Sequence, residues 1–356
     1  HVLFRLVAFI YRLISKKQIW IISDRLNVAG DNGEAFFKYV VKQKNKKFKP
    51  YFLISKDSPD YKRLNKIGKV LSYGSIKHKI LFLSSPYIIS SHADDLVINP
   101  FGKQWPYYAN YYDYKFIFLQ HGIIQHDMSN WLNKKNKNIH IFVTSTTKEY
   151  ESIINGNYLY SKKETKLVGL PRYDFLNSKS NTNLEKIILV APTWRKKLVH
   201  ELNSKSREIK LGERPYNKKF VKSDYYKHYK SLLNNDKLLL MLKKHGIKLH
   251  FVLHPAIIQQ RKDFKVSGNI IIKENVNYKD EFEKATLLIT DYSSVAFDFA
   301  YLKKPIIYFQ FDKQNFFEKQ IYTKGYFSYE KDGFGDIFTT VEEVIKTHLF
   351  HTRSNP

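Results

Sequence analysis

The apolar run Ala285-Thr286-Leu287-Leu288-Ile289 leads directly into the polar turn Thr290-Asp291-Tyr292-Ser293-Ser294. The run predicts a buried strand, and the apolar residues Val295, Phe297 and Phe299 after the turn predict a helix. Such a junction points unpaired backbone N–H groups and two hydroxyls at one place, which suits a bound anion. The alternative is a plain helix cap, because Asp and Ser cap helices of every kind.

Short apolar runs recur along the chain on both sides of this junction, separated by helical stretches such as 32–41 and 147–154. Those in the first half lie at 19–23, 51–54, 70–72, 87–90, 116–119, 141–143 and 167–169. Those in the second half lie at 187–190, 249–253, 270–273, 287–290 and 306–309. This alternation predicts an α/β protein with mostly parallel sheets and helices on both faces.

A polar segment rich in Asn and Ser, residues 171–183, interrupts the alternation and predicts a linker. At 356 residues the chain is long enough for two domains. We therefore expect an N-terminal domain at 18–172 and a C-terminal domain at 183–345, each a Rossmann-like doubly wound sheet. Because ligands of such sheets bind at the carboxyl ends of strands, we expect the active site in a central cleft that both domains face.

The charge of the chain predicts an anionic partner. Lys and Arg number 60 against 33 Asp and Glu, which gives a net charge of +27. That field favours nucleic acid, an acidic membrane surface or a polyanionic substrate. Because 43% of the residues are hydrophobic, the charge does not indicate disorder.

The absence of cysteine excludes disulfides and thiolate metal sites, and it permits a reducing compartment. No apolar run approaches the roughly 20 residues of a membrane-spanning helix. Because the chain begins at His1 rather than Met, a preceding signal or anchor stays an open alternative.

Residues 1–17 predict a basic amphipathic helix. Arg5, Arg12 and Lys16 fall on one face, and apolar residues fill most of the remainder. This composition suits a helix that lies in an anionic membrane interface or contacts the acceptor, and the alternative is a helix packed on a domain.

A basic insert spans residues 196–230, with eleven Lys or Arg against four Asp or Glu and four interleaved tyrosines, Tyr216, Tyr225, Tyr226 and Tyr229. It predicts either a contact with membrane or polyanion, or a solvated loop.

Polar motifs follow four of the predicted strands, where an α/β protein places its site. They are Gln120-His121-Gly122, Ala191-Pro192-Thr193-Trp194-Arg195, His254-Pro255 and the Thr290–Ser294 turn. His121 is a candidate general base, and Gly122 would let the backbone turn sharply beside its imidazole. Thr193 and Arg195 offer a hydroxyl and a guanidinium to a phosphate. The division indicates a base in one domain and anion-binding groups in the other, as in a group transferase with a phosphate-linked donor.

The sequence lacks common nucleotide-binding motifs and an evident metal-binding cluster. It contains neither a Walker-type loop nor a Gly-rich dinucleotide fingerprint after an early strand. Asp113, Asp127, Asp291 and Asp298 are scattered, so we expect no compact His/Asp cluster, no metal site and no required cofactor.

Taken together, these motifs resemble those of the CDP-glycerol glycerophosphotransferases of teichoic acid synthesis, a family with the GT-B fold. The resemblance covers about residues 18 to 345 and includes, besides the four motifs, Val168-Gly169-Leu170-Pro171-Arg172-Tyr173-Asp174, Val295-Ala296-Phe297-Asp298-Phe299, Lys304-Pro305-Ile306 and Asp312. It implies transfer of glycerol phosphate from CDP-glycerol to a hydroxyl of a lipid-linked or polymeric acceptor, with release of CMP. It also implies a cytoplasmic enzyme, peripheral on the inner face of the cell membrane.

The resemblance also implies roles for single residues. His121 matches the proposed base of the family, and His254 would hold donor phosphate. The other donor-binding residues would be Gly122, Thr193, Arg195, Thr290, Asp291, Ser293, Ser294 and Asp298, the last of these at the ribose or the alditol.

One departure from the family pattern lies around the His121-Gly122 motif. Wall polymerases often have Trp before the motif and Thr-Pro-Leu-Lys after it. This chain has Phe118-Leu119-Gln120 before it and Ile123-Ile124-Gln125-His126-Asp127 after it, which resembles capsule-type polymerases. This departure affects the prediction of the acceptor more than that of the donor.

Three alternatives stay open: CDP-ribitol as donor, a CMP-activated acidic sugar as donor, and nucleic-acid binding. The last is disfavoured because no nucleic-acid module is present and the basic residues are spread along the chain.

Overall fold

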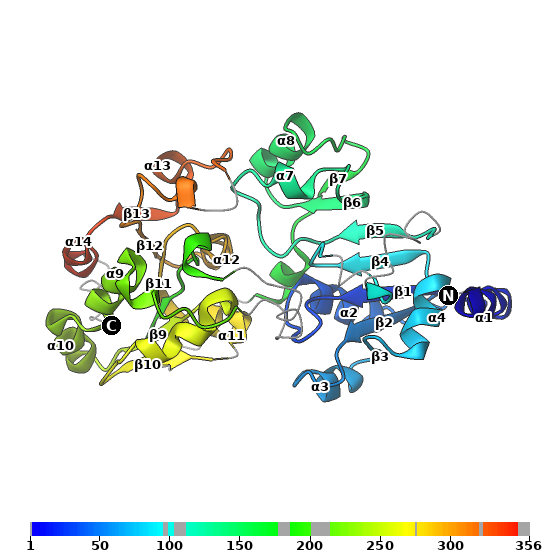
Figure 1. The fold of residues 1–356 in the computed structure, drawn as a ribbon, viewed down its shortest axis with the longest axis horizontal. Helices are drawn as coiled ribbons and strands as arrows, with labels where there is room; N and C mark the ends of the chain where they lie inside the picture. Colours follow the sequence, from blue (N-terminus) through cyan, green and yellow to red (C-terminus); the bar gives the residue numbers. More distant parts are fainter. Residues whose placement is uncertain are drawn as a thin grey trace. The chain divides into compact units, whose positions relative to one another are not determined.

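The computed structural model describes residues 2–94, 99–102, 112–176, 186–200, 214–274, 276–319 and 323–347 (Figure 1). The chain divides into two compact units. Unit 1 contains His1–Ile124 and Met128–Phe175, and unit 2 contains Gln125–Asp127 and Leu176–Pro356. The short segment Gln125–Asp127 therefore belongs to unit 2, a detail that no sequence pattern predicts.

Unit 1 is built on a parallel sheet in the order β3-β2-β1-β4-β5-β6-β7. Its strands are β1 (Gln18–Ser23), β2 (Phe48–Ile54), β3 (Val70–Ser72), β4 (Tyr87–Ser90), β5 (Lys115–Phe118), β6 (Ile139–Thr144) and β7 (Thr165–Leu167). Its helices are α1 (Val2–Ile14), α2 (Asn32–Lys42), α3 (Tyr61–Asn65), α4 (Ile76–Ser84), α7 (Ser129–Leu132) and α8 (Thr147–Asn155), with a 3₁₀ turn η3 (Pro171–Phe175) packed against α2.

Unit 2 is built on a second parallel sheet in the order β10-β9-β8-β11-β12-β13. Its strands are β8 (Ile187–Val190), β9 (Lys248–Val252), β10 (Ile270–Lys273), β11 (Ala285–Thr290), β12 (Ile306–Phe309) and β13 (Gly335–Phe338). Its α-helices are α9 (Asp224–Leu233), α10 (Asp236–Lys244), α11 (Tyr278–Lys284), α12 (Val295–Tyr301), α13 (Tyr329–Asp332) and α14 (Val341–Lys346). The 3₁₀ turns are η4 (Lys196–Leu198), η6 (Phe220–Lys222), η7 (Pro255–Asp263) and η8 (Phe317–Lys319).

The predicted α/β architecture with two doubly wound sheets is confirmed. Each predicted strand is present, although the one predicted at 167–169 lies at Thr165–Leu167, and β13 is an additional one. It escaped prediction because Gly335-Asp336-Ile337-Phe338 is only half apolar and lies at the sheet edge. The predicted cleft between the two sheets stays a prediction.

The end of the basic insert at 196–230 is helical, which neither interpretation predicts; residues 201–213 lie outside the described part. Residues 224–230 belong to helix α9, and Tyr225 and Tyr229 of that helix are buried in the core of unit 2. Their spacing of four places them on one face of a helix, where Tyr229 packs against Phe251 and Phe309 and Tyr225 packs against Tyr229. These two tyrosines are core residues and do not contact a polyanion.

The start of helix α2 is fixed tightly against β1. The buried carboxylate of Asp24, just after β1, accepts hydrogen bonds from the backbone N–H groups of Asp31 (3.0 Å), Gly33 (2.7 Å) and Glu34 (3.1 Å). These bonds satisfy donors that a helix start leaves unpaired. A Cβ atom on Gly33 would lie 2.3 Å from the carbonyl oxygen of Ser23, so only glycine allows this close approach. The contact fixes the position of Asp31, the N-cap of α2.

Candidate functional site

His121 lies in the loop after β5, at the carboxyl edge of the unit 1 sheet, as the strand pattern predicts. Its side chain is 56% exposed and can meet a substrate. The backbone turn beside it differs from the prediction. The residue with left-handed backbone is Gln120, with φ of +68°, and Gly122 has no positive φ. A non-glycine residue avoids this conformation unless its surroundings hold it there.

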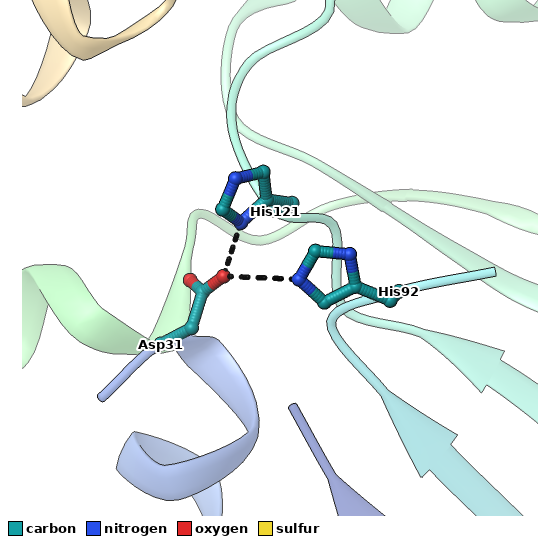
Figure 2. A group of neighbouring side chains, drawn as sticks. All are labelled: Asp31, His92 and His121. Carbon is teal, nitrogen blue, oxygen red and sulfur yellow. Dashed lines mark hydrogen bonds and ion pairs between the residues drawn. The ribbon is translucent and has the colours of Figure 1, made fainter. Parts of the chain in front are cut away.

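The imidazole of His121 is paired with the carboxylate of Asp31, a residue that sequence reasoning missed. Nδ1 of His121 hydrogen bonds to Oδ2 of Asp31, as Figure 2 shows. With Nδ1 donating to a carboxylate, Nε2 is the nitrogen that can accept a proton. A carboxylate in this place fixes the tautomer of a histidine base and stabilises the imidazolium that forms.

Arg172 of η3 holds both members of this pair. Its Nη1 donates to Oδ1 of Asp31 at 2.7 Å and to the carbonyl oxygen of His121 at 2.6 Å. Burial alone would raise the pKa of Asp31, but the adjacent His121 and Arg172 outweigh burial and hold that pKa well below its usual range. Asp31 is therefore an anion at neutral pH.

His92, after β4, completes the group in Figure 2. Its Nε2 lies 3.8 Å from Oδ2 of Asp31, and its ring centroid lies 4.5 Å from that of His121. Burial, followed by the positive charges of His121 and Arg25, lowers the pKa of His92 well below its usual value. His92 is thus a neutral neighbour that adds no positive charge beside the base.

The prediction that no compact His/Asp cluster exists is wrong for unit 1. Ligand atoms of Asp31, His92 and His121 lie within 4.8 Å of one another. Two guanidinium groups also reach the cluster, because Arg172 binds Asp31 and Nε of Arg25 donates to Nε2 of His92 at 3.4 Å. Because these guanidinium groups already place positive charge beside Asp31 and His92, the arrangement favours a hydrogen-bond network over a metal site. The expectation that no metal or cofactor is required stays a prediction.

In unit 2, the side chains of the first two residues of the Thr290–Ser294 turn form hydrogen bonds within the unit. Oγ1 of Thr290 donates to the carbonyl oxygen of Ala191 at 2.7 Å. The fully buried Asp291 accepts from the backbone N–H groups of Thr193 (2.8 Å) and Tyr292 (2.6 Å). The predicted direct donor contacts of Thr290 and Asp291 are therefore not supported, because these polar groups face the interior.

Arg195 follows β8, as the strand pattern predicts, but its side chain is not free to reach a ligand. Its guanidinium is buried, with Nη2 lying 2.9 Å from Oδ2 of Asp291 and Nε donating to Oδ2 of Asp312 at 2.8 Å. Nη1 donates to the carbonyl oxygen of Thr193 at 2.5 Å. The ring of Phe316, 4.7 Å from the guanidinium carbon, covers it further. Burial between two carboxylates explains the difference from the predicted phosphate contact: Arg195 joins the loops after β8, β11 and β12.

Asp298, in the first turn of α12, is only 2% exposed. Its position does not favour the predicted contact with ribose or alditol. The predicted donor residues that remain accessible in unit 2 are Ser293, Ser294 and His254, all partly buried.

Local hydrogen bonds orient the side chains of His254 and Ser293. Nδ1 of His254 accepts from the backbone N–H of Ala256 at 3.1 Å, and its ring stacks 5.9 Å from that of Trp194. Oγ of Ser293 accepts from the N–H of Val295 at 3.4 Å. In the part of the chain that the structure describes, the buried Oγ1 of Thr193 has no hydrogen-bond partner.

The segment Gln125–Asp127 supports the same turn, and sequence reasoning missed this too. Nε2 of Gln125 donates to the carbonyl oxygen of Tyr292 at 2.5 Å. Asp127 forms a two-way backbone bridge with Thr323. A Cβ atom on Gly325 would lie 2.5 Å from the carbonyl oxygen of Gln125, so the segment fits closely within unit 2. No local pattern marks it, because its partners lie far along the chain.

We expect Asp291→Asn to lower the free energy of unfolding of unit 2 by about 3–5 kcal/mol, because the change leaves the Arg195 charge buried with one carboxylate fewer. Urea unfolding followed by circular dichroism measures the loss. Asp224→Asn is the control, since Asp224 and Lys227 form an exposed pair 3.9 Å apart whose loss costs less than about 1 kcal/mol. Equal unfolding midpoints for the two variants would contradict the structural role of Asp291.

Comparison with known proteins extends over the whole chain. The family model CDP-Glycerol:Poly(glycerophosphate) glycerophosphotransferase matches residues 3–350. The chain is 42% identical over 352 residues to the minor teichoic acid biosynthesis protein GgaB of Bacillus subtilis (strain 168), covering 99% of this chain and 38% of GgaB. It is 29% identical over 192 residues to the teichoic acid poly(glycerol phosphate) polymerase of the same organism, covering 50% of this chain and 22% of the polymerase. The chain thus spans about two fifths or less of the length of these two relatives.

Solved structures show the same fold. The wall teichoic acid polymerase TagF superposes with a TM-score of 0.64 at 18% identity, covering 96% of this chain and 83% of that chain. UDP-GlcNAc 2-epimerase of Methanocaldococcus jannaschii superposes with a TM-score of 0.54 at 12% identity, covering 95% of this chain and 93% of that chain. The fold is therefore GT-B-like. The family match, which the sequence motifs anticipated, shows that the chain belongs to the CDP-glycerol:poly(glycerophosphate) glycerophosphotransferase family.

Proposed function

We propose that this glycerophosphotransferase-family enzyme transfers glycerol phosphate from CDP-glycerol to a hydroxyl of a lipid-linked or polymeric acceptor and releases CMP. The observation that carries the proposal is the Asp31–His121 pair, an oriented and accessible base at the carboxyl edge of a parallel sheet. The donor is supported by the family description and by a solved structure of TagF soaked with CDPG.

The proposed reaction is a single displacement at phosphorus. Nε2 of His121 takes the proton of the acceptor hydroxyl as its oxygen attacks the phosphorus that carries glycerol. The bond from that phosphorus to the CMP oxygen breaks, and CMP leaves with the electron pair. Asp31 stabilises the imidazolium, and most of the rate enhancement comes from alignment and charge stabilisation.

On the donor side we assign direct contacts to the accessible residues only. His254, Ser293 and Ser294 would contact the diphosphate, whereas the hydroxyl of Thr193 is buried and receives no direct contact. Thr290, Asp291 and Arg195 would act by positioning these residues, since their own polar groups are bonded within unit 2. Gly122, the residue after the base, stays a proposed donor contact through its backbone.

We expect His121→Ala to abolish CMP release while leaving CDP-glycerol affinity within about twofold, because the imidazole acts on the acceptor proton. His254→Ala should instead weaken CDP-glycerol binding, by about tenfold for one lost hydrogen bond to a charged group. Calorimetry gives the affinities, and CMP release is measured with CDP-glycerol, CDP-ribitol and CMP-sialic acid. His140→Ala, which removes an exposed histidine of unit 1, is the control and should behave as wild type.

Normal turnover by His121→Ala would overturn the assignment of the base. Faster CMP release from CDP-ribitol or CMP-sialic acid than from CDP-glycerol would overturn the assignment of the donor.

We also propose that the enzyme binds peripherally to the inner face of the cell membrane through α1. Most apolar side chains of α1 are exposed, including Leu3 (71%), Leu6 (56%) and Leu13 (71%), while Ala8 is buried where the helix contacts α4. Arg5, Arg12 and Lys16, which the sequence predicts to contact the membrane or the acceptor, are also exposed. An exposed apolar face with flanking cations suits an anionic lipid interface. In the described part of the chain, no helix is both long and apolar enough to cross a membrane.

A lysine cluster near α1 supports this proposal. Nζ of Lys49 and Nζ of Lys77 each lie 5.6 Å from the ring centroid of Tyr51, which neighbours Tyr11 of α1. Burial, and then the charges of Lys49, Lys77 and Lys17, lower the pKa of Lys69. Ammonium groups gathered in this way attract phosphate groups such as those of lipids.

We expect the double variant Arg5→Gln/Arg12→Gln to reduce binding to phosphatidylglycerol vesicles roughly thirtyfold, since each cation near an anionic surface contributes about 1 kcal/mol. Leu6→Glu/Leu13→Glu should abolish binding, because it removes the apolar contact. Vesicle sedimentation measures both, with Leu240→Glu, which changes a 68% exposed leucine of α10, as the control. Binding that survives both double variants would contradict the membrane role of α1.

A further inference from the structure

Glu149 is a buried acid that neither the motifs nor the proposed chemistry uses. It lies in the first turn of α8, and its side chain is inaccessible to solvent. Oε2 accepts from the backbone N–H of Ser145 at 2.7 Å. Oε1 accepts from Nε2 of Gln120 at 3.0 Å and from the backbone N–H of Ile124 at 2.7 Å.

Gln120 and Ile124 are the two ends of the five-residue loop that carries His121. One carboxylate oxygen therefore joins both ends of this loop, while the other oxygen ties it to the turn that begins α8. Burial raises the pKa of Glu149 to about 7, and the N–H groups that point at the carboxylate oppose that shift.

Gln120 has the left-handed backbone that sets the direction of His121. Both hydrogens of its side-chain amide are used, because Nε2 also donates to the carbonyl oxygen of Val143 at 2.8 Å. Its own carbonyl oxygen accepts from Nδ2 of Asn32, next to Asp31, at 2.7 Å. The unfavourable backbone conformation is thus held from both sides, and Glu149 provides the contact with the side chain of Gln120.

We infer that Glu149 is a positioning residue for His121, whose two hydrogen bonds from Oε1 close the Gln120–Ile124 loop and aim the imidazole at the acceptor hydroxyl. This inference rests on the proposed function, since it concerns the same base. Misplacement of a reacting group by about 1 Å can cost roughly a hundredfold in rate. Loss of the closure should therefore lower kcat by about ten- to a hundredfold while leaving donor affinity unchanged.

The test is Glu149→Gln, which keeps the shape of the side chain but replaces one acceptor oxygen with a donor that faces N–H groups. The matched control is Glu281→Gln. Glu281 is also a buried acid, bonded to His250 and Lys273, but it lies in unit 2. We expect both variants to lose thermal stability, and only Glu149→Gln to lose kcat for CMP release, with its affinity for CDP-glycerol unchanged. Wild-type kcat for Glu149→Gln would overturn the inference, as would an equal loss of kcat in Glu281→Gln.

Gln120→Met is the second variant, for the case in which Glu149→Gln does not fold. It removes the link to Oε1 and keeps the length of the side chain. Nitrogen-15 NMR of histidine-labelled protein reports the hydrogen bond between His121 and Asp31 without any need for activity. We expect the Nδ1 signal of His121 to shift in Gln120→Met, and an unchanged signal would overturn the inference.

These outcomes separate the two proposals. If His121→Ala is inactive and Glu149→Gln is fully active, the inference about Glu149 fails and the proposed function stands. If His121→Ala is active, the assignment of His121 as the base fails, and the NMR measurement alone decides whether Glu149 orients His121.

Discussion

The hydrogen bond between the carboxylate of Asp31 and the imidazole of His121 is the interaction on which the account of this enzyme depends. It links the start of α2 to the loop after β5, two points 90 residues apart in the sequence. Asp24 fixes the start of α2, and Arg172 holds the carboxylate and the His121 backbone together. Together these contacts orient the exposed imidazole of His121 with Nδ1 bonded to Asp31 and Nε2 left to accept a proton.

In unit 2, as in unit 1, buried charged residues fix the loops at the carboxyl edge of the sheet. Its buried cluster of Arg195, Asp291 and Asp312 joins three loops at the carboxyl edge of the sheet. Burying three charges is unfavourable unless each is paired and hydrogen-bonded, which is the case here. The cluster itself is largely buried, whereas Ser293 and Ser294, which follow Asp291 in the sequence, remain accessible.

The strands and the placement of His121 at a strand end could be predicted from the sequence, because buried parallel strands read as short apolar runs. Asp31 could not, because a strand pattern shows which residues lie at a sheet edge and does not show which side chains meet there. Arg195 was predicted to offer its guanidinium to a phosphate, and its burial could not be predicted because its partner Asp312 lies 117 residues away. Gly122 was expected to supply the turn because glycine usually does, whereas the structure holds Gln120 in that conformation through its side chain.

The most direct test of the central claim is the rate of CMP release from CDP-glycerol by Asp31→Asn at pH 7.5, with donor affinity measured on the same protein. The amide can still cap α2, but it carries no charge to stabilise the imidazolium. The account predicts a kcat lower by roughly a hundred- to ten-thousandfold, with unchanged affinity for CDP-glycerol. A kcat within twofold of wild type would contradict it.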